Sequence, residues 1–163
     1  MTDFADIDPD VLGLDVSEWV NSDPIDAASL RGQVVMVETF QMLCPGCIEH
    51  GLPTARRVHN ALSNQGVRVL GLHTVFEHHK VQDADALRVF VAEYRFPFPI
   101  GIDRPVPGRA IPSTMDRYQL QGTPSTLVAD RAGRIRSISF GQVDEIKLAA
   151  LLGRVLAEPA PEG

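Results

Sequence analysis

The chain has 163 residues, of which 44% are hydrophobic and 22% charged, the composition of an ordinary globular domain that can bury a sizeable core. The net charge is −6 and the arginines stand singly or in pairs, which argues against nucleic acid or an anionic membrane surface as a partner. No apolar run is long enough to cross a membrane, and residues 1–6 lack the features of a signal peptide, so we expect a cytoplasmic protein.

Strand and helix signals alternate along the chain, as in a single α/β domain. We expect this domain at residues 14–157, preceded by an acidic N-terminal arm at 1–13 and followed by a disordered tail at 158–163. The domain is expected to open with an edge strand or hairpin at 14–21 and one helical turn at 26–32.

The next part of the chain predicts two buried strands joined by a helix. The run from Val34 to Phe40 is apolar and rich in β-branched residues, which is typical of a strand buried on both faces, and 67–73 has the same character. The helix expected at 47–64 is the crossover between the two strands, so they should be parallel.

The second half of the domain predicts a longer helix, a strand, a short helix, a hairpin and a closing helix. The longer helix begins at Asp83, a strand follows at 98–102, and a capping box at 113–116 begins the short helix. Strands at 125–129 and 135–140 form the hairpin. The closing helix is expected to bury an apolar side made of Ile146, Ala149, Ala150, Leu152 and Val155.

The only two cysteines, Cys44 and Cys47, stand where the first buried strand gives way to a helix. A C-x-x-C pair at such a junction in an α/β pattern is typical of a redox-active dithiol. A zinc site would need more ligands, and the sequence has no second cysteine pair, so we expect neither a metal nor a cofactor.

Helix geometry predicts different roles for the two thiols. If Cys44 caps the helix, Pro45 takes the first helical position, where its missing N–H costs nothing, and the N–H of Cys47 points at the Cys44 sulfur. That N–H and the positive end of the helix should lower the pKa of Cys44 and make it the nucleophile. Cys47 is then the resolving thiol, which displaces the substrate from Cys44.

Three segments resemble the thioredoxin superfamily, and within it the TlpA-like branch of the redoxins. They are residues 30–37, the Cys44 to Cys47 motif, and residues 118–135. The resemblance implies an α/β, thioredoxin-like fold: a central mixed β-sheet flanked by helices on both faces, with an N-terminal extension and a helix-containing insertion before a cis-proline loop. Pro53 falls one residue later than the family spacing, so the helix beyond Cys47 is expected to differ in phase.

Pro124 matches the position of the family's cis-proline. A cis Thr123–Pro124 bond turns the chain sharply and brings this loop against the dithiol. The resemblance implies that the Thr123 backbone pairs with an extended substrate segment, and that Phe40, Pro45 and Gly46 also contact the substrate.

Glu38 stands where thioredoxins carry a buried aspartate. A carboxyl group in an apolar strand is costly as an anion, so its pKa should be raised. We expect Glu38 to accept the proton of Cys47, directly or through a water, when that thiol attacks. The alternative is a carboxylate at a strand end that reaches solvent or an arginine.

His50 follows Cys47 on the same helical face, where it could modulate the dithiol, although a solvated histidine is the favoured interpretation. His73, His78 and His79 do not predict a metal site. Neighbouring histidines in an extended segment point to opposite sides, and no carboxylate or thiol stands at ligand spacing.

The sequence therefore predicts a thiol:disulfide oxidoreductase, working as a reductase because cytosolic thiols are kept reduced. Its partners would be protein or small-molecule disulfides and a thiol reductant, either thioredoxin reductase-like or glutathione. A thiol peroxidase is an alternative, although Gln41 occupies the position where peroxiredoxins have threonine or serine. A non-catalytic binding or metal-handling domain with the same fold is the third interpretation.

Overall fold

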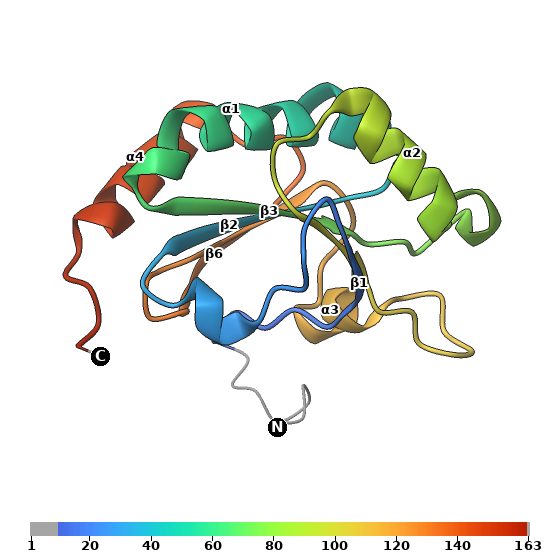
Figure 1. The fold of residues 1–163 in the computed structure, drawn as a ribbon, viewed down its shortest axis with the longest axis horizontal. Coiled ribbons are helices and arrows are strands. Elements are labelled where there is room, and N and C mark those ends of the chain that lie inside the picture. Colours follow the sequence, from blue (N-terminus) through green and yellow to red (C-terminus); the bar gives the residue numbers. More distant parts are fainter. Residues whose placement is uncertain (1–9, 163) are drawn as a thin grey trace.

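A computed structural model describes residues 10–162, which build a six-stranded mixed β-sheet (Figure 1). The strands are β1 (Val16–Val20), β2 (Val34–Phe40), β3 (Val67–His73), β4 (Ile100–Asp103), β5 (Ser125–Ala129) and β6 (Ile135–Phe140). Across the sheet they run in the order β1-β4-β3-β2-β5-β6. β2, β3 and β4 are mutually parallel, and β1, β5 and β6 are antiparallel to their neighbours, so the predicted mixed sheet is confirmed.

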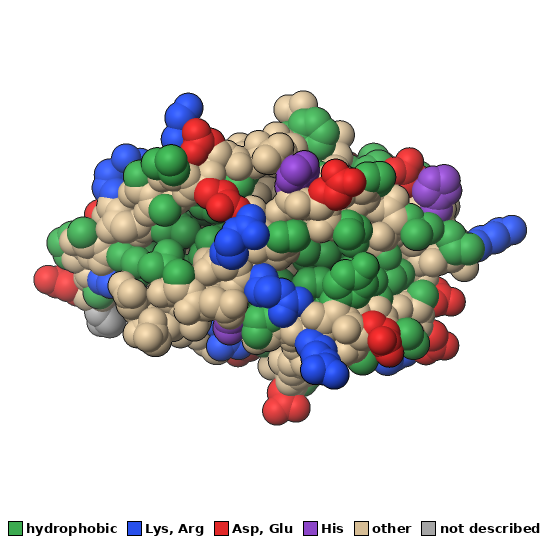
Figure 2. Space-filling model, turned by 90° about the horizontal axis from the view of Figure 1, so that it is seen from above, with side chains coloured by type: hydrophobic (Ala, Val, Ile, Leu, Met, Phe, Trp, Pro, Cys, Tyr) green, Lys and Arg blue, Asp and Glu red, His purple; other side chains and the backbone are tan. Residues whose placement is uncertain are grey.

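Helices lie on both faces of the sheet, as predicted. The longer ones, α1 (Leu52–Leu62), α2 (Ala84–Tyr94) and α4 (Glu145–Ala157), cover one face, and the short α3 (Ser113–Arg117) lies against the other (Figure 1). Shorter turns complete the chain: 3-10 turns at Ala27–Leu30, Ser63–Gln65 and His79–Val81, and a π-helical turn at Cys47–Gly51. On the face covered by α1, α2 and α4, positively and negatively charged side chains are interspersed rather than grouped by sign (Figure 2).

The sheet separates two hydrophobic cores, because successive side chains of a strand point to opposite faces. The core beneath α1, α2 and α4 includes Met36, Leu52, Val69, Leu87 and Leu152. The core on the other face includes Leu30, Val35, Val37, Leu70 and Leu127. All seven residues of β2 are buried, so the prediction of a strand buried on both faces is confirmed.

The start of α3 differs from the prediction of a capping box at 113–116. Pro112 precedes the first turn and supplies no side-chain cap. The buried Asp103, at the end of β4, accepts hydrogen bonds from the backbone N–H groups of Thr114 at 2.7 Å and Met115 at 3.0 Å. The capping side chain, Asp103, belongs to strand β4, so no sequence pattern at the start of α3 predicts it.

The closing helix α4 buries only part of the predicted apolar side: Leu152 and Val155 are confirmed as core residues, and the other three are not. Leu148, Leu152 and Val155 are buried at helical spacing, whereas Ile146 is 83% exposed. The predicted core residues Ala149 and Ala150 are exposed too. Apolar residues occur on more than one side of this helix, so its docking against the sheet, rather than its periodicity alone, selects the buried side.

Packed structure extends to residues on both sides of the predicted domain. Leu12 is buried, and its N–H donates to the carbonyl of Gly133 at 2.7 Å. The Tyr118 hydroxyl donates to the carbonyl of Val11 at 2.8 Å. Residues 10–13 of the predicted arm therefore pack on the domain, while residues 1–9 lie outside the described part of the chain.

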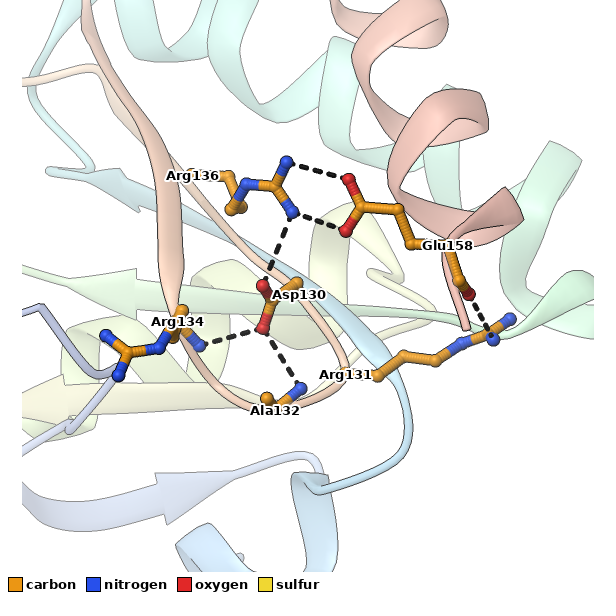
Figure 3. Close-up of polar contacts among 6 residues, drawn as sticks. All are labelled: Asp130, Arg131, Ala132, Arg134, Arg136 and Glu158. Carbon is orange, nitrogen blue, oxygen red and sulfur yellow. Dashed lines mark hydrogen bonds and ion pairs between the residues drawn. The ribbon is translucent and has the colours of Figure 1, made fainter. Parts of the chain in front are cut away.

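Glu158, the first residue of the predicted tail, is held by arginines at the β5–β6 hairpin (Figure 3). The Arg136 guanidinium donates to both carboxylate oxygens of Glu158, at 2.5 and 2.7 Å, and also reaches Asp130 at 3.4 Å. Arg131 donates to the Glu158 carbonyl at 3.2 Å. These contacts tie the end of α4 to the hairpin. Residue 163 lies outside the described residues.

Candidate active site

The two cysteines lie just beyond the end of β2 and form a disulfide, with their Cα atoms 5.2 Å apart. Residues 45 and 46 already have helical backbone, and the N–H of Cys47 lies 3.2 Å from Cys44 Sγ. Cys44 is partly exposed, whereas Cys47 is fully buried. The structure thus presents Cys44 to solvent and keeps Cys47 behind it, the asymmetry that a nucleophile and a resolving thiol need.

The helical turn that follows Cys47 is wider than an α-helical turn. In the π-helical turn Cys47–Gly51, the N–H of Leu52 bonds to the carbonyl of Cys47. A π-turn holds one more residue than an α-turn, which accounts for Pro53 standing one residue later than the family spacing. Pro53, which has no N–H to donate, stands in the first turn of α1, directly after the π-turn.

Glu38 is buried beneath this π-turn and is only 1% exposed. Its Oε2 accepts a 2.8 Å hydrogen bond from the hydroxyl of Thr126, its register partner on β5. A Cβ added at Gly51 would lie 2.6 Å from Glu38 Oε1 and 2.9 Å from Cβ of Pro124. The Gly51 backbone therefore closes over the carboxyl group, and a larger residue there would clash.

Burial sets the protonation of Glu38. Loss of solvation raises the pKa of its carboxyl well above the ordinary 4.5, and the hydrogen bond from Thr126 lowers it only in part. Within the described residues, Oε1 has no hydrogen-bond partner. The group is thus a carboxylic acid over a wider pH range than an exposed glutamate, rather than the solvated carboxylate of the alternative interpretation.

The loop at Thr123 and Pro124 forms one wall of the site, and the peptide bond between them is cis. The carbonyl oxygen of Thr123 lies 3.5 Å from Cys44 Sγ. A Cβ added at Gly46 would lie 3.4 Å from Cδ of Pro124, so the proline ring packs against the start of the helix. Thr123 is half-buried and Pro124 is buried.

Two buried glutamines hold the segment that leads from β2 to Cys44. Gln82 Oε1 accepts from the N–H of Leu43 at 3.0 Å, while Gln82 Nε2 donates to Gln41 Oε1 at 3.1 Å and to the Glu77 carbonyl at 2.9 Å. Gln41 Nε2 in turn lies 3.5 Å from the Thr123 hydroxyl. The segment before Cys44 is therefore fixed to the loop after β3 and to the cis-proline loop.

The prediction that Phe40 contacts substrate is wrong. Phe40 is 0% exposed, and its ring lies 6.2 Å from that of Phe90 and 5.2 Å from that of His73. Its place on β2 directs it into the core beneath the helices, where no substrate can reach it. Leu43, 55% exposed, is the apolar side chain that this segment presents to solvent.

The other predicted residues near the dithiol are accessible. Pro45 is exposed and Gly46 is partly exposed. His50 lies in the π-turn with 43% of its side chain exposed, and its Nε2 is 3.9 Å from the Glu49 carboxylate. These surroundings fit the favoured interpretation of a solvated histidine, and a role for His50 in modulating the dithiol stays a prediction.

Among residues 10–162, no group of three or more His, Cys, Asp or Glu side chains is arranged to hold a metal ion. Over the same residues, every helix is too short or too polar to cross a bilayer.

Three residues of the site were missed by sequence reasoning. Thr126 could have been found, since an antiparallel strand next to β2 places a polar side chain opposite Glu38. Gly51 carried a weak signal, because a glycine inside a helix often marks a close approach. Gln82 lies in an irregular segment far along the chain, and nothing in the sequence connects it with Cys44.

Comparison with known proteins found close relatives of known structure. No protein family model matches the chain. A thiol-disulfide isomerase from Corynebacterium glutamicum is 52% identical and superposes with a TM-score of 0.89, over 91% of this chain and 97% of that one. A thioredoxin-like superfamily protein is 48% identical with a TM-score of 0.88, over 91% and 96% of the two chains.

The chain is also similar to part of a longer mycobacterial protein. It is 27% identical to protein DipZ of Mycobacterium tuberculosis over 157 residues, which are 94% of this chain and 21% of DipZ. The chain thus spans about a fifth of the length of that curated relative.

The buried carboxyl of Glu38 should give the stability of the oxidised protein a measurable pH dependence. Above about pH 4.5 the carboxyl stays protonated in the folded state but ionises in the unfolded chain, because folding raises its pKa. The folded state then binds more protons, so stability is lost as pH rises, by up to about 1.4 kcal/mol per pH unit until the folded pKa is passed. Glu38→Gln should lack this loss.

The measurement is urea unfolding of the oxidised wild type and Glu38→Gln over a series of pH values. Glu49→Gln is the matched control, because the Glu49 side chain is 70% exposed on the turn above Glu38. Parallel stability curves for wild type and Glu38→Gln would contradict the raised pKa.

Proposed function

Because the chain belongs to the thioredoxin-like thiol:disulfide oxidoreductases, we propose that Cys44 is the nucleophile of the reaction and Cys47 the resolving thiol. One observation carries this assignment: Cys44 is partly exposed, and its Sγ receives the N–H of a fully buried Cys47 at 3.2 Å. An N–H directed at sulfur at the start of a helix stabilises negative charge there.

The reaction runs in two exchanges. The Cys44 thiolate attacks one sulfur of a substrate disulfide, whose S–S bond breaks, so that one substrate thiolate leaves and a mixed disulfide forms. Cys47 then gives up its proton and attacks Cys44 Sγ, which closes the Cys44–Cys47 disulfide seen in the structure and releases the second substrate thiolate. The substrate gains two electrons and the dithiol loses two.

Glu38 is the group we assign to receive the Cys47 proton. It lies beneath the turn that Cys47 opens, and the Gly51 backbone covers its Oε1. A general base works best when its pKa is near the working pH, and burial moves the pKa of Glu38 in that direction. Its position in the hydrophobic core keeps the transferred proton away from bulk water.

The substrate is expected to lie along the wall formed by Thr123, Pro124, Pro45 and Gly46. The Thr123 backbone is half-buried beside Cys44, and an extended substrate segment could add to it as a strand adds to a sheet edge. Protein disulfides are the substrate class that this backbone pairing favours, and small disulfides need only Cys44.

We propose that the enzyme works as a reductase, and that a thioredoxin reductase-like enzyme or glutathione then reduces its Cys44–Cys47 disulfide. This direction rests on the cytoplasmic location, which stays a prediction from the sequence, as does placement in the TlpA-like branch. The similar protein of Corynebacterium glutamicum is named an isomerase, and an isomerase would use the same first attack by Cys44.

The division of roles between the cysteines predicts an asymmetric trap. With oxidised glutathione, Cys47→Ser should accumulate a glutathione mixed disulfide at Cys44, because the resolving thiol is missing. Cys44→Ser should form its adduct at least about tenfold more slowly, because Cys47 is buried. Mass spectrometry of time points measures both adducts. Equal rates for the two variants would contradict the assignment.

The reductase direction predicts the redox equilibrium of the Cys44–Cys47 pair. In graded glutathione or dithiothreitol buffers, read by thiol alkylation, we expect one two-electron transition at or below about −220 mV, within the cytosolic range. A potential near about −120 mV, typical of a strong oxidant, would overturn the reductase direction. No reversible transition at all would overturn the dithiol reaction itself.

A further inference from the structure

The chain between the end of β2 and Cys44 contains no helix or strand. Met42 packs against the core beneath the helices, but Leu43, the residue next to Cys44, is 55% exposed. The Leu43 side chain therefore does not anchor the chain beside the nucleophile. A hydrogen bond to the Leu43 backbone can do so instead.

Gln82 makes that hydrogen bond from a part of the chain 39 positions away. It lies directly before Asp83, the N-cap of α2, and it is only 4% exposed. Its Oε1 accepts from the N–H of Leu43 at 3.0 Å. This contact holds the peptide group between Met42 and Leu43, so it fixes the backbone one residue before Cys44.

The neighbours of Gln82 allow its amide only one orientation. Each of the two N–H groups on Nε2 meets an oxygen, since the Gln41 Oε1 lies at 3.1 Å and the Glu77 carbonyl at 2.9 Å. A flipped amide would direct its N–H groups at the N–H of Leu43 and its oxygen at two other oxygens, so all three hydrogen bonds would be lost. The oxygen that receives the Leu43 N–H is therefore held in place before a substrate arrives.

Gln41 joins this contact to the loop after β3. It is 1% exposed, and its Oε1 accepts from the backbone N–H groups of Phe76 at 3.3 Å and Glu77 at 3.4 Å, as well as from Gln82. Two of these three donors belong to the backbone, so the orientation of the Gln41 amide is fixed too. A buried hydrogen-bond network thus connects the loop after β3 with the segment before Cys44.

The position of Cys44 matters because a directed hydrogen bond stabilises its thiolate. The backbone N–H of Cys47 lies 3.2 Å from Cys44 Sγ. A hydrogen bond weakens as its distance grows and as its angle departs from linear, so a displaced sulfur would lose part of this stabilisation. Because such an N–H and the start of a helix lower the pKa of a thiol, loss of the alignment should raise the pKa of Cys44.

We propose that Gln82 is a positioning residue for Cys44: through the Leu43 backbone, it keeps the nucleophile aligned with the N–H of Cys47. This proposal rests on the proposed function of Cys44 as the nucleophile. Gln82 acts through another residue, so it supports the reacting groups rather than being one of them.

The test is the pH profile of Cys44 alkylation by iodoacetamide in the Cys47→Ser protein, where Cys44 is the only thiol. In this background, Gln82→Met nearly keeps the shape of the side chain but removes its amide. We expect the midpoint of the profile to rise by about one pH unit, because the thiolate loses its alignment with the backbone N–H of residue 47. Exchange with oxidised glutathione should slow about threefold at a pH below both midpoints, because the more basic thiolate is scarcer but more nucleophilic.

Two variants in the same background are the controls, and each should keep the midpoint. Gln65→Met removes an exposed glutamine amide in the turn after α1. Thr114→Val removes a buried hydroxyl that accepts from the N–H of Asp15 at 2.9 Å, so it controls for the general effect of losing a buried hydrogen bond. An unshifted midpoint in Gln82→Met, or an equal shift in Thr114→Val, overturns the role of Gln82.

The titratable groups on the elements around Cys44 are the same in every variant, so a difference between profiles reports the substitution. The cis-proline loop at 120–124 contributes no titratable side chain. The groups on β2, the π-turn, the end of β3 and the loop after β3 are Glu38, Glu49, His50, His73 and Glu77.

A measurement on the unmodified chain tests the contact even if Gln82→Met fails to fold. The N–H of Leu43 should exchange slowly with deuterium in the oxidised wild type, although Leu43 is exposed, because its partner oxygen belongs to a buried side chain. Exchange as fast as that of an unstructured peptide overturns the proposal. Failure of Cys47→Ser to form a mixed disulfide with oxidised glutathione would overturn the nucleophile assignment as well, whereas an adduct with an unshifted profile in Gln82→Met overturns only the role of Gln82.

Discussion

The burial of one carboxyl group in the central strand constrains the rest of the active site. Glu38 can remain in the core only if its surroundings accept a polar group there. Thr126 supplies a hydrogen bond from the neighbouring strand, and Gly51 lets the helix backbone approach Oε1 where a Cβ would lie only 2.6 Å away. The π-turn places Gly51 over the Glu38 carboxyl group. The helix that carries Cys47 therefore packs closely against the strand that carries Glu38.

The same arrangement gives the two cysteines different surroundings. Cys44 lies at the edge of the core and is partly exposed, and the carbonyl of Thr123 and the N–H of Cys47 face its sulfur. Cys47 lies inside the core, on the turn above Glu38. Cys44 is therefore the more accessible cysteine of the pair, and Glu38 is the proton acceptor that we propose for Cys47. The glutamine pair Gln41 and Gln82 holds the segment that leads to Cys44 in place.

Much of the fold and of the active site could be predicted from the sequence, because local sequence patterns encode them. The β-branched run Val34–Phe40 gave both the strand and its burial, and the cysteine spacing gave the dithiol. Three errors share a cause, which is that tertiary packing decided the outcome. Packing directs Phe40 into the core, turns Ile146 to solvent, and brings Asp103 to cap α3. Gln82 can bind the segment before Cys44 only because the loop after β3 lies beside the site. No sequence pattern near Cys44 indicates that arrangement.

The proton transfer from Cys47 to Glu38 is tested most directly by following the reduced protein as it reacts with an aromatic disulfide, dithiobis-nitrobenzoate. Attack by Cys44 releases one thionitrobenzoate, and resolution by Cys47 releases the second, so stopped-flow absorbance separates the two steps. We predict that Glu38→Gln slows the second step by roughly a hundredfold and removes its pH dependence, while the first step stays at the wild-type rate. Glu49→Gln should leave both steps unchanged. A second step in Glu38→Gln with the wild-type rate and pH profile would contradict the account.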